Sequence, residues 1–191
     1  MKQEAVRKAR RRLKDANAAL TCVSTSRDFR GVETAWGHFL RDLNGVFIAL
    51  ERGIEGPQNR QWRDFKKEIR NEDPLLAYLH HARDAEEHGI APVVSSKPGG
   101  VTISAGAQFS MMLVPDEDEE IGFQMVPLPG PGIVFNQPEI RLVSVVDRNG
   151  QGYDPPAEHL GMPLLDGSPA NVGSMALSYY DGLIREAGKL A

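Results

Sequence analysis

The sequence predicts an α+β protein: an N-terminal antiparallel helical bundle, then a small antiparallel β-rich segment, and finally one C-terminal helix. Three observations predict this class. Apolar residues recur at spacings of three and four through residues 1–90, which is the period of an amphipathic helix. After residue 90, short apolar runs alternate with Gly, Pro and clustered charges, as is typical of strands and turns. Helical spacing returns after residue 168. Because the pattern changes at residue 90, we expect two domains, 1–90 and 91–191.

The first expected helix covers residues 3–19, and a turn is expected over 21–27 because Ser and Thr cluster there. An apolar stripe along one side begins with Val6, Ala9 and Leu13. The other sides carry six basic residues: Arg7, Lys8, Arg10, Arg11, Arg12 and Lys14. This is the strongest basic cluster in the chain, although such clusters are most often simply solvated surface.

The second expected helix is the clearest element of the chain. Its apolar residues alternate at spacings of three and four over about three heptads: Phe29, Val32, Trp36, Phe39, Leu43, Val46 and Leu50. Further apolar residues widen this stripe, which suits a bundle better than a two-stranded coiled coil. Gly53 is expected to cap the helix, because glycine adopts the left-handed conformation at a helix end with little cost.

A shorter third helix is expected after the Gly-Pro pair at 56–57. Its inward side is predicted to carry Trp62, Phe65 and Ile69. Its outward side is basic, with Arg60, Arg63, Lys66, Lys67 and Arg70. This face is therefore a second candidate for binding an anionic partner.

The fourth helix is expected to begin at Asp73-Pro74, because an acidic N-cap and a proline at the first helical position both favour a helix start. It is expected to end at His88, just before Gly89. With 3.6 residues per turn, one side is predicted to be buried, with Leu75, Tyr78, Leu79, Ala82 and Ala85. The opposite side carries His80, His81, Asp84 and His88.

The β-rich segment is predicted to contain six strands, at 92–96, 101–105, 109–114, 121–126, 132–135 and 139–147. The acidic run at 116–120 is expected to be a solvated hairpin tip, and Asn149-Gly150 has the chemistry of a tight turn. The proline-rich stretch at 153–165 is expected to cross the surface without regular structure. A last helix is expected from Ser168-Pro169, with an inward stripe of Val172, Ala176, Tyr179, Leu183 and Ala187.

The composition is that of an ordinary globular protein, with 191 residues of which 41% are apolar and 25% charged. Cys22 is the only cysteine, so no intrachain disulfide is expected. Charges interrupt residues 1–16, where a signal peptide needs an apolar core, and no apolar run approaches the roughly 18 residues of a transmembrane helix. We therefore expect a cytoplasmic protein that does not enter the membrane.

The charges are divided unevenly along the chain. Residues 1–97 carry 18 Lys and Arg against 14 Asp and Glu, whereas residues 98–191 carry 4 against 12. A basic surface attracts a polyanion such as RNA, and an acidic surface repels one. The two parts are therefore expected to meet different partners or each other, although charge counts alone favour two solvated faces.

Arg83 and His88 stand in an R-x-x-x-x-H arrangement at the end of the fourth expected helix, and the polar Asp84 follows the arginine. Here the sequence resembles the HEPN superfamily of helical-bundle domains, in which an arginine precedes a histidine by four to six positions near the end of a late helix. The resemblance covers about the first 90 residues. Many members of this family are endoribonucleases that use no metal.

The resemblance implies metal-independent RNA cleavage without a cofactor. In that role His88 is the general acid or base, Arg83 holds the scissile phosphate, and Asp84 supports His88 from four residues earlier. Positions 83 and 88 differ by roughly 140° around a helix and 7 Å along it, so one rigid helix cannot aim both at one phosphate. Nucleases of this family join the motifs of two protomers in one cleft, which implies a homodimer.

Other interpretations of these residues remain open. Arg83 and Glu87 are also four residues apart, and an ion pair between them makes the arginine less available to a phosphate. The Asp84–His88 spacing is equally compatible with an exposed pair of small stabilising value. His80, Asp84 and His88 form an H-x-x-x-D-x-x-x-H pattern that suggests a metal, but it needs ligands from another helix. His159 has no partner identifiable from the sequence.

Two functions are expected from these patterns. The first is a HEPN-like endoribonuclease of bacterial stress or defence, with RNA on the basic faces of the first and third helices. The second is a non-catalytic module that uses the helical bundle to dimerise and the acidic β-rich segment to bind a protein partner.

Overall fold

The structure is a computed structural model that describes the chain apart from residues 27, 55–57, 90–91, 98–99, 104–108, 116–120, 128–132, 137–138 and 190–191. For residues 58, 70–71 and the strands between 100 and 136, only the backbone is described. The chain forms two compact units, Met1–Ser95 with Ile140–Ala191 and, separately, Ser96–Glu139. The predicted α+β class is confirmed.

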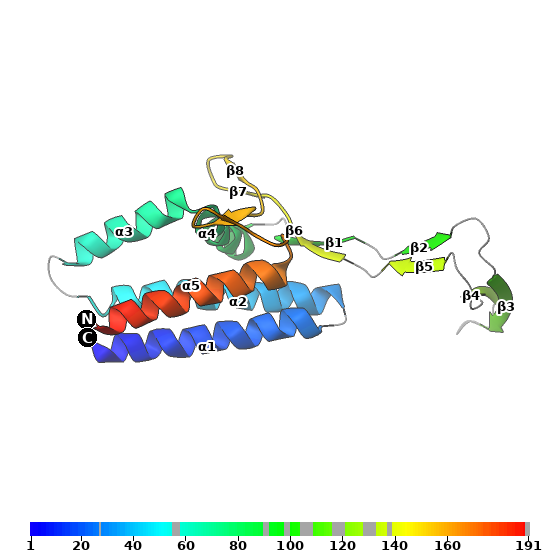
Figure 1. The fold of residues 1–191 in the computed structure, drawn as a ribbon, viewed down its shortest axis with the longest axis horizontal. Coiled ribbons are helices and arrows are strands. Elements are labelled where there is room, and N and C mark those ends of the chain that lie inside the picture. Colours follow the sequence, from blue (N-terminus) through cyan, green and yellow to red (C-terminus); the bar gives the residue numbers. More distant parts are fainter. Residues whose placement is uncertain are drawn as a thin grey trace. The chain divides into compact units, whose positions relative to one another are not determined.

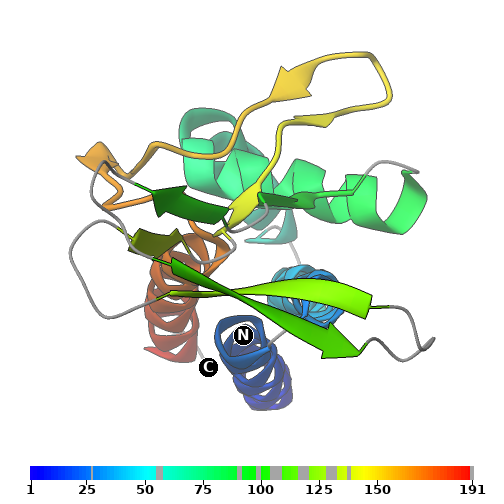
Figure 2. The same ribbon diagram turned by 90° about the vertical axis from the view of Figure 1, so that its right-hand side faces the viewer.

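Within the described residues, the larger unit is built from five helices (Figure 1). Three of them, α1 (Gln3–Thr25), α2 (Phe29–Glu51) and α5 (Pro169–Lys189), run side by side. The other two, α3 (Gln58–Glu72) and α4 (Pro74–His88), pack against each other, and α4 also packs on α2. The view along the helices shows α1 on one side of α2 and α5, with α3 and α4 on the other side (Figure 2).

The core is centred on α2, as its apolar stripe predicts. Trp36, Phe39, Leu43, Val46 and Leu50 are each at most 2% exposed. The rings of Trp36 and Phe39 stack with their centroids 4.9 Å apart. A fully buried Phe or Leu side chain contributes about 1.5–3 kcal/mol through removal of its surface from water, so this stripe stabilises the bundle strongly.

The helix α1 continues to Thr25, so the turn predicted over 21–27 is wrong at its start. The hydroxyl groups of Thr21, Ser24 and Thr25 each donate to the backbone carbonyl four residues earlier. These bonds satisfy the polar side chains inside the helix, and Val23 is buried on its inner side. Ser and Thr residues therefore did not end the helix here.

Gly53 does not cap α2 in the left-handed conformation, because Arg52 occupies the cap position with right-handed helical backbone angles and Gly53 is not among the described glycines with positive φ. A Cβ at Gly53 would lie 2.2 Å from the Cβ of Ala5. Close approach of α1 therefore requires a glycine at this position.

The return of α5 to α1 and α2 explains why the two units differ from the predicted division at residue 90. Its buried side includes Val172, Ala176, Tyr180, Ile184 and Ala187. The predicted inward residues Tyr179 and Leu183 are only half-buried. Tyr180 takes the inner position because its ring meets the edge of Phe47 on α2, with centroids 5.0 Å apart.

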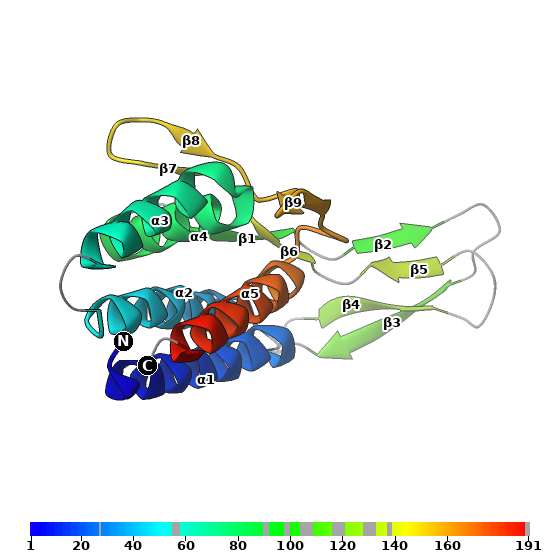
Figure 3. The ribbon, with the colours of Figure 1, turned by 60° about the vertical axis from the view of Figure 1, so that its left-hand side comes forward.

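Short strands complete the larger unit (Figure 3). The strand β7 (Val145–Val146) pairs antiparallel with β8 (Gly152–Tyr153), and β9 (Glu158–His159) pairs antiparallel with β10 (Met162–Pro163). Gly150 has a φ of 83° in the turn after β7, which confirms the predicted Asn-Gly turn. The proline-rich stretch has more regular structure than predicted, because β9 and β10 form there. β1 (Val94–Lys97) pairs with β6 (Glu139–Leu142).

In the smaller unit, the described strands form two antiparallel pairs. The strand β2 (Gly100–Ile103) pairs with β5 (Ile133–Asn136), and β3 (Phe109–Pro115) pairs with β4 (Ile121–Pro127). These strands agree with the apolar runs of the sequence, whereas the strand predicted over 139–147 is divided into β6 and β7. The predicted acidic tip at 116–120 lies outside the described residues.

Candidate functional site

The candidate site lies on α4, which is held in place by contacts at its start and in its middle. At its start, the Asp73 carboxylate accepts from the N–H of Leu76 at 2.9 Å, and Pro74 occupies the first turn, as predicted. In the middle, the Tyr78 hydroxyl donates to the carbonyl oxygen of Val143 at 2.8 Å. Burial raises the pKa of Tyr78 well above its ordinary value, so this hydroxyl keeps its proton. The contact anchors α4 beside the chain that leads into β7.

A pocket of about 430 Å³ lies between the second half of α4 and residues 144–149. On the helix side it is lined by His81, Asp84 and His88, with His88 exposed. On the other side it is lined by β7 and by the turn that contains Asp147 and Arg148. The pocket therefore combines imidazole, carboxylate and guanidinium groups, and two of the three predicted catalytic residues are among them.

Arg83, the third predicted catalytic residue, does not line this pocket. Its guanidinium makes ion pairs with Glu87, one turn later, and with Asp84 at 3.2 Å. Its side chain is only 19% exposed, and its Nε is buried without a hydrogen-bond partner among the described residues. The structure therefore places Arg83 and His88 on different sides of α4, in agreement with the roughly 140° between these positions.

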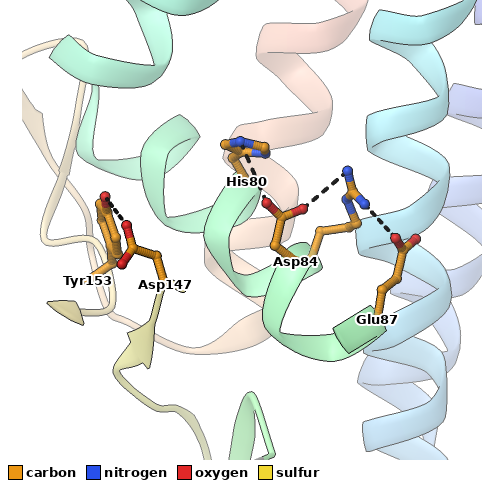
Figure 4. A network of polar contacts seen from close by, with 6 residues as sticks. His80, Asp84, Glu87, Asp147 and Tyr153 are labelled. Carbon is orange, nitrogen blue, oxygen red and sulfur yellow. Dashed lines mark hydrogen bonds and ion pairs between the residues drawn. The ribbon is translucent and has the colours of Figure 1, made fainter. Parts of the chain in front are cut away.

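The side of α4 that carries Arg83 also carries Glu86, which packs on α2. A Cβ added to Gly37 of α2 would lie 2.5 Å from Oε1 of Glu86. Figure 4 shows Glu87 on the part of α4 nearest to a neighbouring helix, away from Asp147 and Tyr153. The contact with α2 thus keeps the arginine away from the pocket.

Asp84 forms ion pairs with Arg83 and His80 of α4 rather than with His88. Within the described residues its ion pairs are with Arg83, at 3.2 Å, and with Nε2 of His80, at 3.8 Å (Figure 4). Its side chain is 41% exposed, so these pairs are partly screened by water. Of the arrangements left open by the sequence, the Arg83–Glu87 pair is the one present here.

The opposite wall of the pocket is held by hydrogen bonds and a ring contact. Asp147 accepts from the backbone N–H groups of Gln151, at 2.9 Å, and Asn149, at 2.8 Å, which lower the pKa of its carboxyl group. The Tyr153 hydroxyl lies 3.5 Å from the same carboxylate (Figure 4), and burial together with Asp147 raises the pKa of Tyr153. The ring of Tyr153 stacks on His81 with centroids 3.6 Å apart. Asp147 therefore carries a negative charge over a wide pH range.

The predicted RNA-binding residues of α3 are only partly available. Arg60 is 3.9 Å from Asp64, and Lys66 makes a half-buried ion pair with Glu51 of α2 at 2.7 Å. Arg63 and Lys67 are exposed, and the side chain of Arg70 lies outside the described residues. Since α1 and α3 lie on opposite sides of α2 (Figures 1 and 2), their basic faces do not form one surface.

His159, which has no partner identifiable from the sequence, forms a buried pair with the N-cap of α4. Its Nδ1 lies 3.0 Å from both carboxylate oxygens of Asp73, and the two residues are 3% and 5% exposed. The N–H of Leu160 donates to the same carboxylate at 2.7 Å. Because 86 residues separate the pair, no local pattern could have predicted it.

Three further findings concern metal ligands, membrane spans and similarity to known proteins. Among the residues that the structure describes, no three His, Cys, Asp or Glu side chains are grouped so that they could hold a metal ion. Within the same part of the chain, no helix is both long enough and apolar enough to cross a membrane. Comparisons of the chain with protein families, with curated proteins and with solved structures found no match.

Proposed function

We propose that this chain is a non-catalytic interaction module, in which a helical body that resembles a HEPN bundle carries a β-rich segment that binds a second protein chain. The observation that carries the proposal is the pairing of Arg83 with two carboxylates of its own helix. A metal-independent nuclease needs that cation free for the scissile phosphate.

The electrostatic argument can be given a magnitude. A phosphate that approaches Arg83 also approaches Asp84 and Glu87, whose carboxylates contact the same guanidinium. Two like charges at 4 Å near a protein surface repel by about 4 kcal/mol. The arginine is also held on the side of α4 away from His88. Phosphate binding at this position is therefore unfavourable in the conformation described.

The register of β3 and β4 supports binding through the β-rich segment. Alternate positions of β3 pair with alternate positions of β4, which places one set of residues on one face of the ladder: Phe109, Met111, Leu113 and Pro115 with Pro127, Met125, Phe123 and Ile121. All eight are apolar. A two-stranded ladder is only marginally stable alone in water, so a partner that covers this face stabilises it. A second copy related by a two-fold axis presents the same apolar face.

The proposed dimer, in which two copies join through this apolar face of β3 and β4, is tested by light scattering with size-exclusion chromatography at micromolar concentration. We expect the wild type to be a dimer and Met111→Lys to be a monomer. Met112→Lys is the matched control, because it introduces the same charge one position away, opposite Gln124 on the other face. It is expected to leave the dimer intact. A monomeric wild type, or equal effects of the two substitutions, would refute the proposed interface.

A second candidate, the endoribonuclease, is favoured by one specific observation. The exposed His88 shares its pocket with Asp84 and Arg148, so an acid or base and a cation other than Arg83 lie in one cavity. Incubation of purified protein with mixed RNA and a chelator separates the two functions. We expect wild type and His88→Ala to leave the RNA equally intact. Cleavage by the wild type that is abolished in both His88→Ala and Arg148→Ala would establish the nuclease and overturn the non-catalytic proposal.

A further inference from the structure

The helix α1 exposes a row of cations on the side away from the core. Arg7, Arg10, Arg11 and Lys14 are all exposed. Their positions correspond to i, i+3, i+4 and i+7, so they fall within about 100° of the helix surface and along about 10 Å of its axis. On the opposite side Ala9 is fully buried. The row is therefore directed to solvent by the packing of α1.

Within the described part of the chain, these cations have little compensation. Arg7 lies 3.6 Å from Glu4, but both side chains are at least 80% exposed, so water screens this pair strongly. Among the described residues, no ion pair involves Arg10, Arg11 or Lys14. The positive charge of the row is therefore available to a partner.

The contrast with α3 is informative. There Lys66 is 22% exposed and paired with Glu51 at 2.7 Å, and Arg60 has Asp64 one turn away at 3.9 Å, which leaves two exposed cations, Arg63 and Lys67, without an ion pair among the described residues. On α1, Arg7 and Arg11 instead line an open groove together with Lys8, Arg12, Glu4 and Asp15. The α1 row thus offers more uncompensated charge than the α3 face predicted from the sequence.

The chemistry of the row favours a phosphate backbone over other anions. Three of its four cations are arginines, whose planar guanidinium matches phosphate oxygens through two parallel hydrogen bonds. Neighbouring positions on the helix surface are about 5–6 Å apart, so several side chains reach one strand together. An anionic lipid surface would also require apolar anchors beside the cations. Among the residues whose burial is described, the large exposed apolar ones lie elsewhere, at Ile48, Val146, Leu160, Met162 and Leu165.

We infer that the exposed row Arg7, Arg10, Arg11 and Lys14 on α1 binds the phosphate backbone of a nucleic-acid strand without sequence preference. This inference is independent of the proposed dimer and of any cleavage. It rests on residues of α1 and involves neither the β3–β4 ladder nor the pocket on α4. The row contains no aromatic side chain on which a base could stack, so we expect its contacts to be with the phosphates.

The experiment measures fluorescence anisotropy of a labelled oligouridylate at several salt concentrations. One variant replaces Arg7, Arg11 and Lys14 by glutamine. The matched control makes the same change in charge on α3, with Arg60, Arg63 and Lys67 replaced by glutamine. All six side chains are exposed and glutamine is a good helix former, so both variants are expected to fold. Circular dichroism checks this.

The expected result follows from counterion release. The logarithm of the binding constant K falls linearly with the logarithm of the salt concentration. For a single strand, each phosphate neutralised by the protein adds about 0.7 to the magnitude of this slope. The α1 variant neutralises three phosphates fewer, so its slope is expected to be shallower by about 2. At about 0.1 M salt this corresponds to roughly hundredfold weaker binding. The α3 variant is expected to bind almost as wild type. A wild type that does not bind, or equal weakening by the two variants, would overturn the inference.

A gain of affinity provides a second test that misfolding cannot imitate. Glu4 and Asp15 are exposed and line the same groove as the cations. Replacing them by Gln and Asn removes their repulsion of phosphate, so we expect tighter binding of the oligouridylate. Unchanged affinity would contradict the assignment to α1. Polyglutamate that competes as well as unlabelled oligouridylate would show an acidic-protein partner and overturn the nucleic-acid assignment.

Discussion

Replacement of Asp73 by alanine tests how much of the fold depends on one buried carboxylate. This group accepts from the N–H of Leu76 inside α4, from the N–H of Leu160, and from Nδ1 of His159. Loss of an N-cap costs about 1 kcal/mol. Removing the carboxylate also leaves Nδ1 of His159 buried without its partner, which costs about 1–3 kcal/mol, and breaks the hydrogen bond from Leu160, which is worth about 1 kcal/mol. We expect Asp73→Ala to lower the free energy of unfolding by about 3–5 kcal/mol.

The chain offers a matched control at the start of α2. Asp28 is also an N-cap aspartate, and it accepts from the N–H of Gly31 at 2.8 Å, but it is exposed. We expect Asp28→Ala to cost about 1 kcal/mol. The difference between the two variants, about 2–4 kcal/mol, is then due to the contacts with His159 and Leu160. Urea unfolding followed by circular dichroism measures both values.

A double-mutant cycle with His159→Ala isolates the pair itself. Residues in direct contact show coupling energies of about 0.5–3 kcal/mol. We expect the cost of the Asp73→Ala and His159→Ala double variant to be smaller than the sum of the single costs. If Asp73→Ala costs no more than Asp28→Ala, or if the two single costs simply add, the reasoning from burial is refuted.

Two further predictions concern α5. Gly173→Ala and Gly182→Ala make the same change inside one helix, but a Cβ at 173 would lie 2.4 Å from Cδ1 of Leu20 and one at 182 has nothing within 4 Å. In urea unfolding, we expect Gly182→Ala to be more stable than wild type by about 0.5–1 kcal/mol. We expect Gly173→Ala to be less stable than Gly182→Ala by about 1–3 kcal/mol. Equal effects of the two substitutions would contradict the close packing of α1 on α5. Burial, with the nearby Asp73 charge, raises the pKa of Tyr179 to about 12 from an ordinary value of 10.0. Because the pKa of Tyr179 is higher in the folded than in the unfolded state, its contribution to stability is fully present below pH 10 and falls as the pH rises toward 12. Tyr179→Phe is therefore expected to lose less stability between pH 8 and 11 than wild type. An identical loss in the two proteins would contradict this shift.

Much of the fold could be predicted because its signals are local. The stripe of α2 repeats every three or four residues, and Asp73-Pro74 carries the chemistry of a helix start, so both elements lie where expected. The apolar runs also identify β2 to β5. Where the prediction was wrong, a contact with a distant residue decided the outcome: Tyr180 packs on Phe47, and Gly53 adjoins Ala5.

The candidate site was only partly predictable for the same reason. Helix geometry alone separated Arg83 from His88 by about 140°. It could not show which of the two sides would meet α2 and which would line a pocket. The other wall of that pocket comes from the turn at Asp147, more than 50 residues later, and its contribution depends on how α4 and β7 pack.

Local patterns in the sequence were enough to place the bodies of the helices and most of the strands, and to show which side of α2 is buried. These features depend on residues within about one helical turn or one strand of each other. The folded structure was needed to show that α5 joins the first helices, that His159 pairs with Asp73, and that Arg83 meets carboxylates while α1 exposes its cations. Such contacts join distant residues, and they exist because packing buries particular side chains together.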